Sequence, residues 1–395
     1  MNPKYWIIKQ VLDHKGPGFC LEKWGTSTLH LGTGQEHGCH HCGPVSIDPL
    51  ELEDPAALFN HSHKRSVRQE MLDGKIPSEC SYCHTSSGVQ DRIIQSGYTY
   101  NWFNPNIKKL TSNPRSLEVS FSTVCNLACS YCGPTFSSKW QGEIDSQGEY
   151  PNEYNKIHIR PIPERENNPY TEAFWKYWPT IKNNLKQLRI TGGEPLLSKH
   201  TFTLLEESNN IPVTINTNLS VDDTFIDKLI DSIRHKKNVT IASSGEAQGI
   251  KAEYSRHGLR YSKFLTNLSR IKQECPNVNL HIMSTYNVLC VSSFTDFLKD
   301  IKQVDNQISL HVSRLTQPSF LTHLLISDYK DESLDYIKRN FNSDTVERFK
   351  NVFYDDTYIN FLVEQDKFKA FVAEYDKRRG LNFLKTFPEY EFLIR

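Results

Sequence analysis

Three cysteines stand close together near the middle of the chain, at Cys125, Cys129 and Cys132. They follow the segment Leu117–Ser122, in which apolar and polar residues alternate as in a half-buried strand. A strand that ends in a short loop of cysteines can present three thiolates to one small object. Thiolates are soft ligands that hold zinc or iron–sulfur clusters. Because a structural zinc site uses four protein ligands, three thiolates favour a cubane cluster that leaves one iron open.

The spacing C-x3-C-x2-C, with the aromatic Tyr131 before the last cysteine, resembles the signature of the radical S-adenosylmethionine (radical SAM) superfamily. The resemblance implies a [4Fe–4S] cluster on Cys125, Cys129 and Cys132, whose open iron binds the amino and carboxylate groups of S-adenosylmethionine (SAM). It also places Tyr131 beside the cofactor. One electron from the cluster then cleaves the sulfonium and leaves a 5′-deoxyadenosyl radical. On spacing alone, a zinc site completed by a distant histidine and three unrelated core cysteines remain alternatives.

A second motif, Gly192-Gly193-Glu194-Pro195, directly follows the predicted strand Leu188–Thr191. Two glycines let the backbone approach a small ligand because no side chain blocks the way. Taken alone, the motif is also what a tight turn between a strand and a helix requires. It resembles the GGEP motif of radical SAM proteins, which hydrogen-bonds the amino group of SAM. With two such motifs in the right order, each at a strand end, the chain is identified as a member of this superfamily.

Polar residues after the predicted strand Val239–Ala242 are candidates for contacts to the ribose of the cofactor. The family places such contacts where Ser244 and Glu246 stand here, and a hydroxyl and a carboxylate suit two ribose hydroxyls. An ordinary polar loop would contain the same residue types. The pattern assigns no catalytic residue. Weaker candidates for the cofactor carboxylate or for the substrate are Asn216, Asn218 and Arg256.

A second group of cysteines lies in the first hundred residues and comprises Cys20, Cys39, Cys42, Cys80 and Cys83. The two C-x2-C pairs in this group match a four-thiol zinc pattern. A different grouping follows from the alternating run at residues 26–31 and from Gly34. A strand, a glycine turn and a returning segment would bring Cys20 and Cys39 together.

This N-terminal arrangement resembles the Twitch domain, a shortened relative of the SPASM domain of many radical SAM enzymes. The resemblance implies an auxiliary [4Fe–4S] cluster on Cys20, Cys39, Cys80 and Cys83 and leaves Cys42 over. The chain departs from the family in one respect, because Twitch domains usually follow the radical SAM barrel and this module precedes it. Zinc remains an alternative, since four thiolates satisfy either metal.

Strands and helices alternate after the cysteine loop, which predicts a parallel α/β sheet with right-handed crossovers. The resemblance implies a partial (β/α)6 barrel with cofactor and substrate at the carboxyl ends of its strands. We expect a Twitch-like auxiliary-cluster module at 1–112, the radical SAM core at 113–315 and a helical C-terminal extension at 316–395. A helix over 171–186 should kink or divide at Pro179. The six expected strands are 117–122, 188–191, 213–218, 239–242, 279–283 and 308–312.

The bulk composition excludes several function classes. The 395 residues include 46 basic and 46 acidic side chains, so the sequence lacks the electrostatic footprint of a general nucleic-acid binder. It contains no run of about 18 apolar residues that would span a membrane, and its first residues do not resemble a signal peptide. We therefore predict a cytoplasmic protein whose ten cysteines are metal ligands rather than disulfides. The isolated Cys275 and Cys290 are expected to be inert buried thiols.

For function, the resemblance implies hydrogen-atom abstraction from an unactivated carbon of a peptide or of a small alcohol or sugar. The auxiliary cluster would then accept the remaining electron. Such an enzyme needs a low-potential electron donor such as flavodoxin or ferredoxin, and no membrane or nucleic-acid partner is expected. An alternative hypothesis is a zinc-stabilised binding module fused to a catalytically inactive barrel. The sequence does not select one substrate class.

Overall fold

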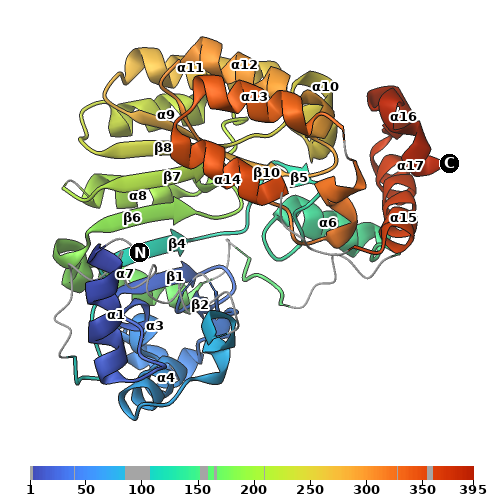
Figure 1. The fold of residues 1–395 in the computed structure, drawn as a ribbon. Coiled ribbons are helices and arrows are strands. Elements are labelled where there is room, and N and C mark those ends of the chain that lie inside the picture. The colour runs from blue at the N-terminus through green and yellow to red at the C-terminus, as the bar shows by residue number, and fades with distance from the viewer. Residues whose placement is uncertain are drawn as a thin grey trace. The chain divides into compact units, whose positions relative to one another are not determined.

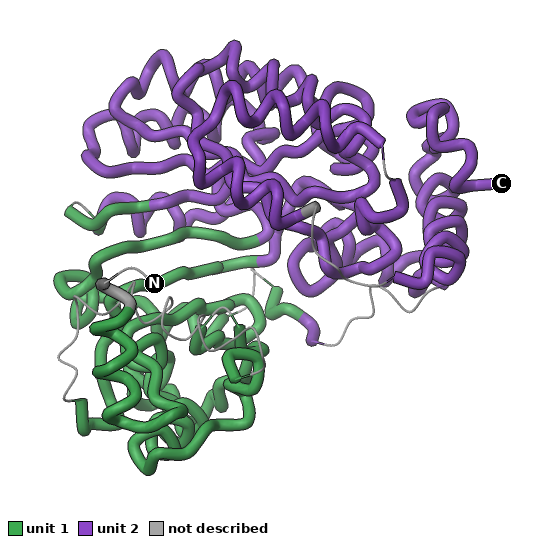
Figure 2. Tube along the Cα trace, viewed as in Figure 1, with its two compact units in different colours: residues 1–122, 161–192, 208–213 green, residues 123–160, 193–207, 214–395 purple. Residues whose placement is uncertain are grey.

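The computed structural model describes residues 3–39, 41–84, 107–151, 159–163, 167–208, 210–326, 328–353 and 359–395 (Figure 1). The chain divides into two compact units (Figure 2). Unit 1 comprises residues 1–122, 161–192 and 208–213, and unit 2 comprises residues 123–160, 193–207 and 214–395. The predicted three-part division at residues 112 and 315 remains a prediction.

Unit 1 contains a mixed sheet in the order β6-β4-β1-β2-β3. β1 (Thr26–His30) pairs in parallel with β4 (Ser116–Ser120), which in turn pairs in parallel with β6 (Gln187–Thr191). On its other side β1 forms an antiparallel hairpin with β2 (Gln35–His37), and β2 pairs with β3 (Val45–Ser46). The helices are α1 (Pro3–Lys15), α2 (Glu22–Gly25), α3 (Ala57–Asn60), α4 (Ser62–Leu72) and α7 (Pro169–Ile181), with 3-10 turns η1 (Pro49–Glu53), η2 (Ser78–His84) and η4 (Lys182–Asn184).

The turn between β1 and β2 depends on Gly34. Its φ is +68°, a left-handed conformation that glycine adopts without steric cost. A Cβ at this position would lie 2.3 Å from Cζ of Tyr170, so the tyrosine ring closes directly over the turn. The Tyr170 hydroxyl donates to the carbonyl of Ile47, 2.9 Å away. The hairpin is therefore sealed by a residue of α7, far along the chain.

The helical part of unit 1 packs around an apolar cluster that includes Trp24 on α2 and Met71 on α4. The rings of Phe19 and Trp24 pack in a tilted arrangement with their centroids 5.1 Å apart. Cys20 and Cys80 pack against the edge of this cluster. The apolar core thus fixes the positions of two of the N-terminal cysteines. The full cluster is Ile8, Leu12, Phe19, Leu21, Trp24, Val67 and Met71.

A buried ion pair joins β2 to α4 in unit 1. Lys64 Nζ lies 2.5 Å from Glu36 Oε1, and Ser27 donates to the same carboxylate at 2.8 Å. Burial opposes ionisation of Glu36, but the Lys64 ammonium outweighs it and lowers the pKa of Glu36 to about 2. Burial lowers the pKa of Lys64 to about 8, with Glu36 offsetting part of this effect. Both partners are therefore charged at neutral pH.

Unit 2 contains strands in the order β11-β10-β8-β7. β8 (Val239–Ser244), β10 (Asn279–Tyr286) and β11 (Ser309–Arg314) pair in parallel, and β7 spans Val213–Thr217. A separate two-residue ribbon joins β5 (Ala128–Cys129) to β9 (Arg256–His257). The helices are α6 (Ser138–Gln147), α8 (Lys199–Glu207), α9 (Asp223–Ile233), α10 (Gly249–Ser255), α11 (Tyr261–Glu274), α12 (Phe294–Val304), α13 (Lys330–Asn340), α14 (Ser343–Phe353), α15 (Phe361–Arg379), α16 (Phe383–Thr386) and α17 (Glu391–Ile394). The 3-10 turns are η5 (Pro195–Leu197), η6 (Val291–Ser293), η7 (Ser319–Leu321), η8 (His323–Leu325) and η9 (Pro388–Tyr390).

The structure confirms a mixed α/β fold with parallel strands and helices. A strand forms at each of the six predicted places, as β4, β6, β7, β8, β10 and β11. Helix α7 does not end at Pro179, and instead continues to Ile181 before η4 follows. The closure of a barrel and the Twitch identity of the N-terminal module remain predictions. Within the described residues, no helix is both long and apolar enough to cross a membrane.

Candidate functional site

The three-cysteine loop is held by its backbone within unit 2. Cys129 on β5 pairs antiparallel with Arg256 on β9, and the amide of Ser130 donates to the carbonyl of Ser255 at 2.7 Å. On the other side of the loop, Ser137 donates through its hydroxyl to the carbonyl of Leu127 at 2.8 Å. The loop is thus a defined structure tied to two neighbouring segments.

The three thiols stand on one short loop, and each is partly buried. After burial, the charges of Cys129 and Cys132 add to the raised pKa of Cys125. Burial raises the pKa of all three thiols, and that of Cys132 to about 12. The backbone amide of Leu127 donates to Cys125 Sγ at 3.4 Å. Such an N–H···S bond stabilises a thiolate at this position.

The two motif glycines pack against the start of the cysteine loop. In unit 1, Gly192 has a φ of +150°, and a Cβ there would lie 2.9 Å from the carbonyl oxygen of Ser122. In unit 2, a Cβ on Gly193 would lie 2.4 Å from the carbonyl oxygen of Val124. The amide of Glu194 donates to that same carbonyl at 2.8 Å. The motif therefore needs glycine because two backbone segments touch.

The carboxylate of Glu194 is committed to the protein itself. It is 2% exposed and accepts from the amide of Asn218 at 2.7 Å and from the Thr217 hydroxyl at 2.8 Å. It also caps η5, which begins at the buried Pro195, by accepting from the amide of Leu196 at 3.1 Å. Burial raises the pKa of Glu194 to about 7, against these three hydrogen bonds. The carboxylate thus fastens the motif to the end of β7.

The ribose candidates differ in accessibility. Ser244 ends β8 and is half-buried. The Glu246 side chain is fully buried, and Arg256 binds it with both nitrogens, Nε at 2.9 Å and Nη2 at 2.6 Å. The Tyr131 hydroxyl donates to Glu246 at 2.9 Å, and burial raises the pKa of Tyr131, which keeps it a donor. Glu246 therefore positions the cysteine loop through Tyr131. No local sequence pattern predicts this contact.

Sequence reasoning assigned no role to Trp140 or to Asn126, and both hold the cysteine loop. The indole nitrogen of Trp140 donates to the carbonyl of Cys129 at 2.8 Å. Asn218, a weak candidate from the sequence, donates to the side-chain oxygen of Asn126 at 2.9 Å. Asn126 in turn donates to the carbonyl of Ser220 at 2.8 Å. The position of Asn126 inside the cysteine motif was a signal from which its role could have been predicted. The sequence around Trp140 gave no such signal.

The N-terminal cysteines of unit 1 gather around the buried Lys23. Lys23 Nζ lies 3.4 Å from Cys42 Sγ and forms an ion pair with Glu79, which also binds His63 at 2.6 Å. Burial opposes its charge, but the thiols and Glu79 outweigh burial and raise the pKa of Lys23. The lysine thus provides a cationic centre among the thiols.

Cys42, left over by the sequence analysis, belongs to this gathering. Its Sγ lies 3.6 Å from Cys39 Sγ, and the hydrogen bond from Cys39 lowers the pKa of Cys42 to about 5. The pKa of Cys80 reflects the charges of Lys23, Cys20 and Cys42, so these groups are electrostatic neighbours. Cys83 stands three residues further on, in the same turn η2, and is half-buried.

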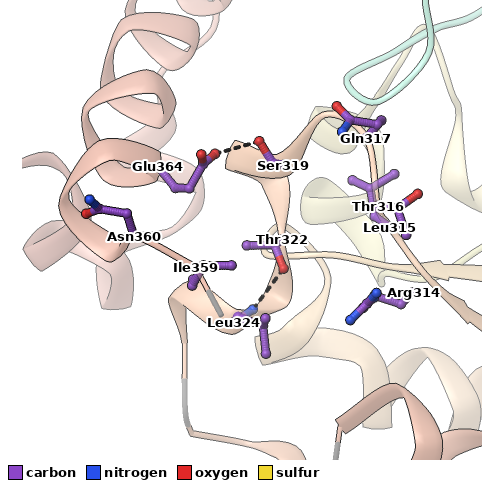
Figure 3. A pocket seen from close by; sticks show the side chains of 10 residues that line it. All are labelled: Arg314, Leu315, Thr316, Gln317, Ser319, Thr322, Leu324, Ile359, Asn360 and Glu364. Atoms are coloured by element: carbon purple, nitrogen blue, oxygen red, sulfur yellow. Dashed lines mark hydrogen bonds between the residues drawn. The ribbon is translucent and has the colours of Figure 1, made fainter. Parts of the chain in front are cut away.

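A cavity of about 350 Å³ lies beyond the carboxyl end of β11 in unit 2 (Figure 3). Arg314 ends that strand, and Asn360 and Glu364 enter the cavity from the start of α15. Ser319 donates to Glu364 at 2.7 Å across one side of it. Seven of the ten lining residues are polar, and they include a guanidinium and a carboxylate. It consists of Arg314, Leu315, Thr316, Gln317, Ser319, Thr322, Leu324, Ile359, Asn360 and Glu364.

Among the described residues, no group of three or more histidines, cysteines or carboxylates is arranged to hold a metal ion.

No family model matches the chain. Two curated relatives align over 147 residues, which is 36% of this chain and 34% of theirs. They are the methylenetetrahydrofolate–tRNA-(uracil-5-)-methyltransferases TrmFO 1 of Mycoplasma mycoides subsp. mycoides, 26% identical, and TrmFO 2 of Mycoplasma capricolum subsp. capricolum, 25% identical. The chain thus spans about a third of the length of these curated relatives.

Several solved structures show a distant likeness. Streptococcus suis SuiB bound to S-adenosylmethionine matches with a TM-score of 0.42 and 15% identity, over 85% of this chain and 75% of SuiB. SuiB bound to its precursor peptide SuiA matches with a TM-score of 0.39 and 15% identity, over 87% and 76%. TYW1 with a lysine–pyruvate adduct matches with a TM-score of 0.34 and 13% identity, over 59% and 78%. At these identities and scores, the likenesses assign neither a family nor an activity to this chain.

Proposed function

We propose that this protein is a radical SAM enzyme whose [4Fe–4S] cluster binds to Cys125, Cys129 and Cys132. The observation that carries the proposal is that three partly buried cysteines stand on one loop whose backbone is fixed by neighbouring segments. A soft, three-thiolate donor set with an N–H···S bond to Cys125 fits a cubane cluster. In a cubane each thiolate binds a different iron, so the cysteines stand farther apart than the ligands of a single ion.

The contacts of the second motif suggest how the chain would hold SAM. The Glu194 carboxylate is buried in three internal hydrogen bonds, whereas Gly193 is half-buried and carries no side chain. We therefore assign the contact with the amino group of SAM to the backbone at Gly193 and a fastening role to Glu194. Ser244 remains the candidate for the ribose, and Glu246 acts through Tyr131.

When bound, the cluster and SAM would supply the 5′-deoxyadenosyl radical that abstracts a hydrogen atom from a peptide or a small alcohol or sugar. The cavity at Arg314 and Glu364 is the candidate substrate pocket, because ligands of parallel α/β sheets bind beyond the carboxyl ends of the strands. Its guanidinium and carboxylate suit a polar substrate. The N-terminal cysteines Cys20, Cys39, Cys80 and Cys83 would hold an auxiliary cluster that accepts the remaining electron.

The proposal is tested by 5′-deoxyadenosine formation in the anaerobically reconstituted full-length chain, given SAM and dithionite. We expect product from the wild type and none from Cys125→Ala. Cys275→Ala is the matched control, because this isolated and fully buried thiol lies on another part of unit 2. A wild-type protein loaded with iron that forms no product would refute the proposal, and so would a fully active Cys125→Ala.

A second candidate function is a zinc-stabilised binding module fused to an inactive barrel. The 3.6 Å separation of Cys39 Sγ and Cys42 Sγ favours it. Two thiolates on one tetrahedral zinc, with Zn–S bonds of about 2.3 Å, stand about 3.8 Å apart. Metal analysis of the full-length chain carrying alanine at Cys125, Cys129 and Cys132 separates the candidates. Iron on the remaining cysteines supports the auxiliary cluster, and stoichiometric zinc supports the binding module.

A further inference from the structure

We propose that Arg379, at the end of the C-terminal helix α15, is a positioning residue that fixes the three-cysteine loop and raises the reduction potential of its cluster. The inference rests on the proposed function. It gives the C-terminal helices a direct part in the redox site, where the sequence predicted a helical C-terminal extension. α6 and α15 lie side by side in Figure 1, and Arg379 lies where they meet.

The first observation is a hydrogen bond to the backbone of the loop. Arg379 Nη1 donates to the carbonyl of Ala128 at 3.1 Å, and its side chain is 2% exposed. Ala128 immediately precedes Cys129. A buried guanidinium bonded to this carbonyl restricts the backbone that carries the second cysteine.

The second observation is that Arg379 and Trp140 act on successive carbonyls. Trp140 donates to the carbonyl of Cys129, and the Arg379 guanidinium lies over the Trp140 ring at 4.4 Å from its centroid. The guanidinium also lies over the ring of Tyr375, at 3.8 Å from its centroid. Arg379 Nε also donates to Glu143 on α6 at 2.9 Å. The guanidinium thus contacts two aromatic rings and a carboxylate, and these contacts hold it at the carbonyl of Ala128.

The third observation concerns charge. The remaining nitrogen, Arg379 Nη2, is buried without a hydrogen-bond partner among the described residues. Its bond to the carbonyl of Ala128 places the positive charge of Arg379 one residue from the ligand Cys129. One-electron reduction adds negative charge to a thiolate-ligated cluster, so a nearby buried cation stabilises the reduced form. Arg256 and Arg379 each have a carboxylate partner, Glu246 and Glu143 respectively.

The chain supplies a matched control in the preceding residue. Arg378 is also an arginine of α15, and its side chain is 3% exposed. It bonds to Glu374 at 2.7 Å and to the carbonyl of Gly148 at 2.8 Å, and lies over the ring of Tyr150. Apart from a 3.9 Å approach to Glu143, the carboxylate that also binds Arg379, these contacts lead to Glu374 and to the segment after α6. Arg378→Gln therefore removes an equally buried charge from the same helix while leaving the loop contact in place.

The test compares Arg379→Gln, Arg379→Lys and Arg378→Gln in the reconstituted full-length protein. The readouts are iron content and the midpoint potential of the cluster whose EPR signal changes when SAM is added. We expect Arg379→Gln to lower the ratio of reduced to oxidised cluster about threefold at a fixed potential, which is about 28 mV at 59 mV per tenfold change. Arg379→Lys should restore the potential, because it keeps the charge. Arg378→Gln should match the wild type.

Circular dichroism on all three variants verifies that they fold. If Arg379→Gln does not fold, the comparison of Arg379→Lys with Arg378→Gln still provides a test. Equal potentials and iron contents in Arg379→Gln and Arg378→Gln would overturn the inference and leave the proposed function intact. A wild-type loop that binds no cluster would instead refute the proposed function, and this inference with it.

Discussion

The three cysteines of unit 2 lie on one loop, whereas the five cysteines of unit 1 come from separated parts of the chain, around residues 20, 40 and 80. The loop is positioned mainly through its backbone carbonyls and amides, with Trp140 and Ser137 among the donors. In unit 1, a lysine ammonium stands directly beside the thiols. The comparison indicates that hydrogen bonds to its backbone position the loop, whereas an apolar core and a buried lysine position the N-terminal cysteines.

The largest expected effect comes from removing the loop thiols. Replacing Cys125, Cys129 and Cys132 with alanine should reduce SAM cleavage at least about 1,000-fold, because no ligand remains for the cluster that supplies the electron. If the N-terminal cysteines bind the proposed metal, that metal should stay, because they lie in unit 1 and the loop lies in unit 2. Product analysis and metal content measure both. Loss of both metals together would show that the two sites are not independent.

Removing N-terminal cysteines instead of the loop cysteines should change the stability of unit 1 without changing SAM cleavage. Cys80→Ser with Cys83→Ser should remove the N-terminal metal and lower the free energy of unfolding of unit 1 by several kcal/mol, since metal binding there contributes to folding. SAM cleavage without substrate should remain within about twofold of the wild type. Hydrogen exchange resolved by segment, together with 5′-deoxyadenosine assays, provides the measurements. Unchanged exchange in α4 and η2 would contradict the expected dependence on metal.

The pH dependence of stability should have opposite signs in the two units. The pKa of Glu36 is lowered from 4.5 to about 2, so its contribution is present above pH 4.5 and is lost as the pH falls through about 2. The pKa of Glu194 is raised from 4.5 to about 7, so its contribution is present below pH 4.5 and is lost as the pH rises through about 7. Each corresponds to about 3 kcal/mol.

The sign of each pH dependence is tested by measuring the free energy of unfolding of Glu36→Gln, Glu194→Gln and the wild type at each pH. Glu36→Gln should cost about 3–5 kcal/mol at pH 7, because Lys64 stays buried without its partner. That cost should shrink in acid. Glu194→Gln should flatten the fall in unit 2 stability between about pH 4.5 and 7. If stability changed with pH in the same direction in both units, the expected difference between the two units would be contradicted.

The smallest effect concerns the fifth N-terminal cysteine. If the auxiliary cluster binds Cys20, Cys39, Cys80 and Cys83, then Cys42→Ser should change bound iron by less than about twofold, because a thiol outside the ligand set is not needed to hold the cluster. Cys39→Ser, three residues earlier, should release most of it. Iron and zinc analysis of both proteins decides the matter. Equal metal loss in the two variants would place Cys42 among the ligands and favour zinc.

The sequence allowed the main elements to be predicted where local patterns are strong. Alternation of apolar and polar residues marked the first core strand, and the cysteine and glycine motifs follow the carboxyl ends of β4 and β6. What the sequence did not reveal depends on partners far apart in the chain. Arg379 reaches a carbonyl 251 residues away, and β1 pairs with β4, about 90 residues later.

Charge pairing was hidden for a related reason. A glutamate in a motif is expected to face the ligand, yet Glu194 turns to Thr217 and Asn218 on β7 and its following turn. Glu246 similarly meets Arg256, ten residues on, through a bidentate pair that only the fold brings together. Residue types predicted that these positions matter, and tertiary packing decided what each side chain binds.

The closure of the Gly34 turn by Tyr170 has a consequence for synthesis and for protein engineering. Unit 1 is drawn from three chain segments, the last of which ends at residue 213. During translation the N-terminal hairpin therefore waits for α7 to leave the ribosome before its turn is covered. A fragment ending near residue 112 would lack both that cover and the β4 partner of β1. Transplanting the N-terminal cysteine site into another protein accordingly requires residues from more than half the length of this chain.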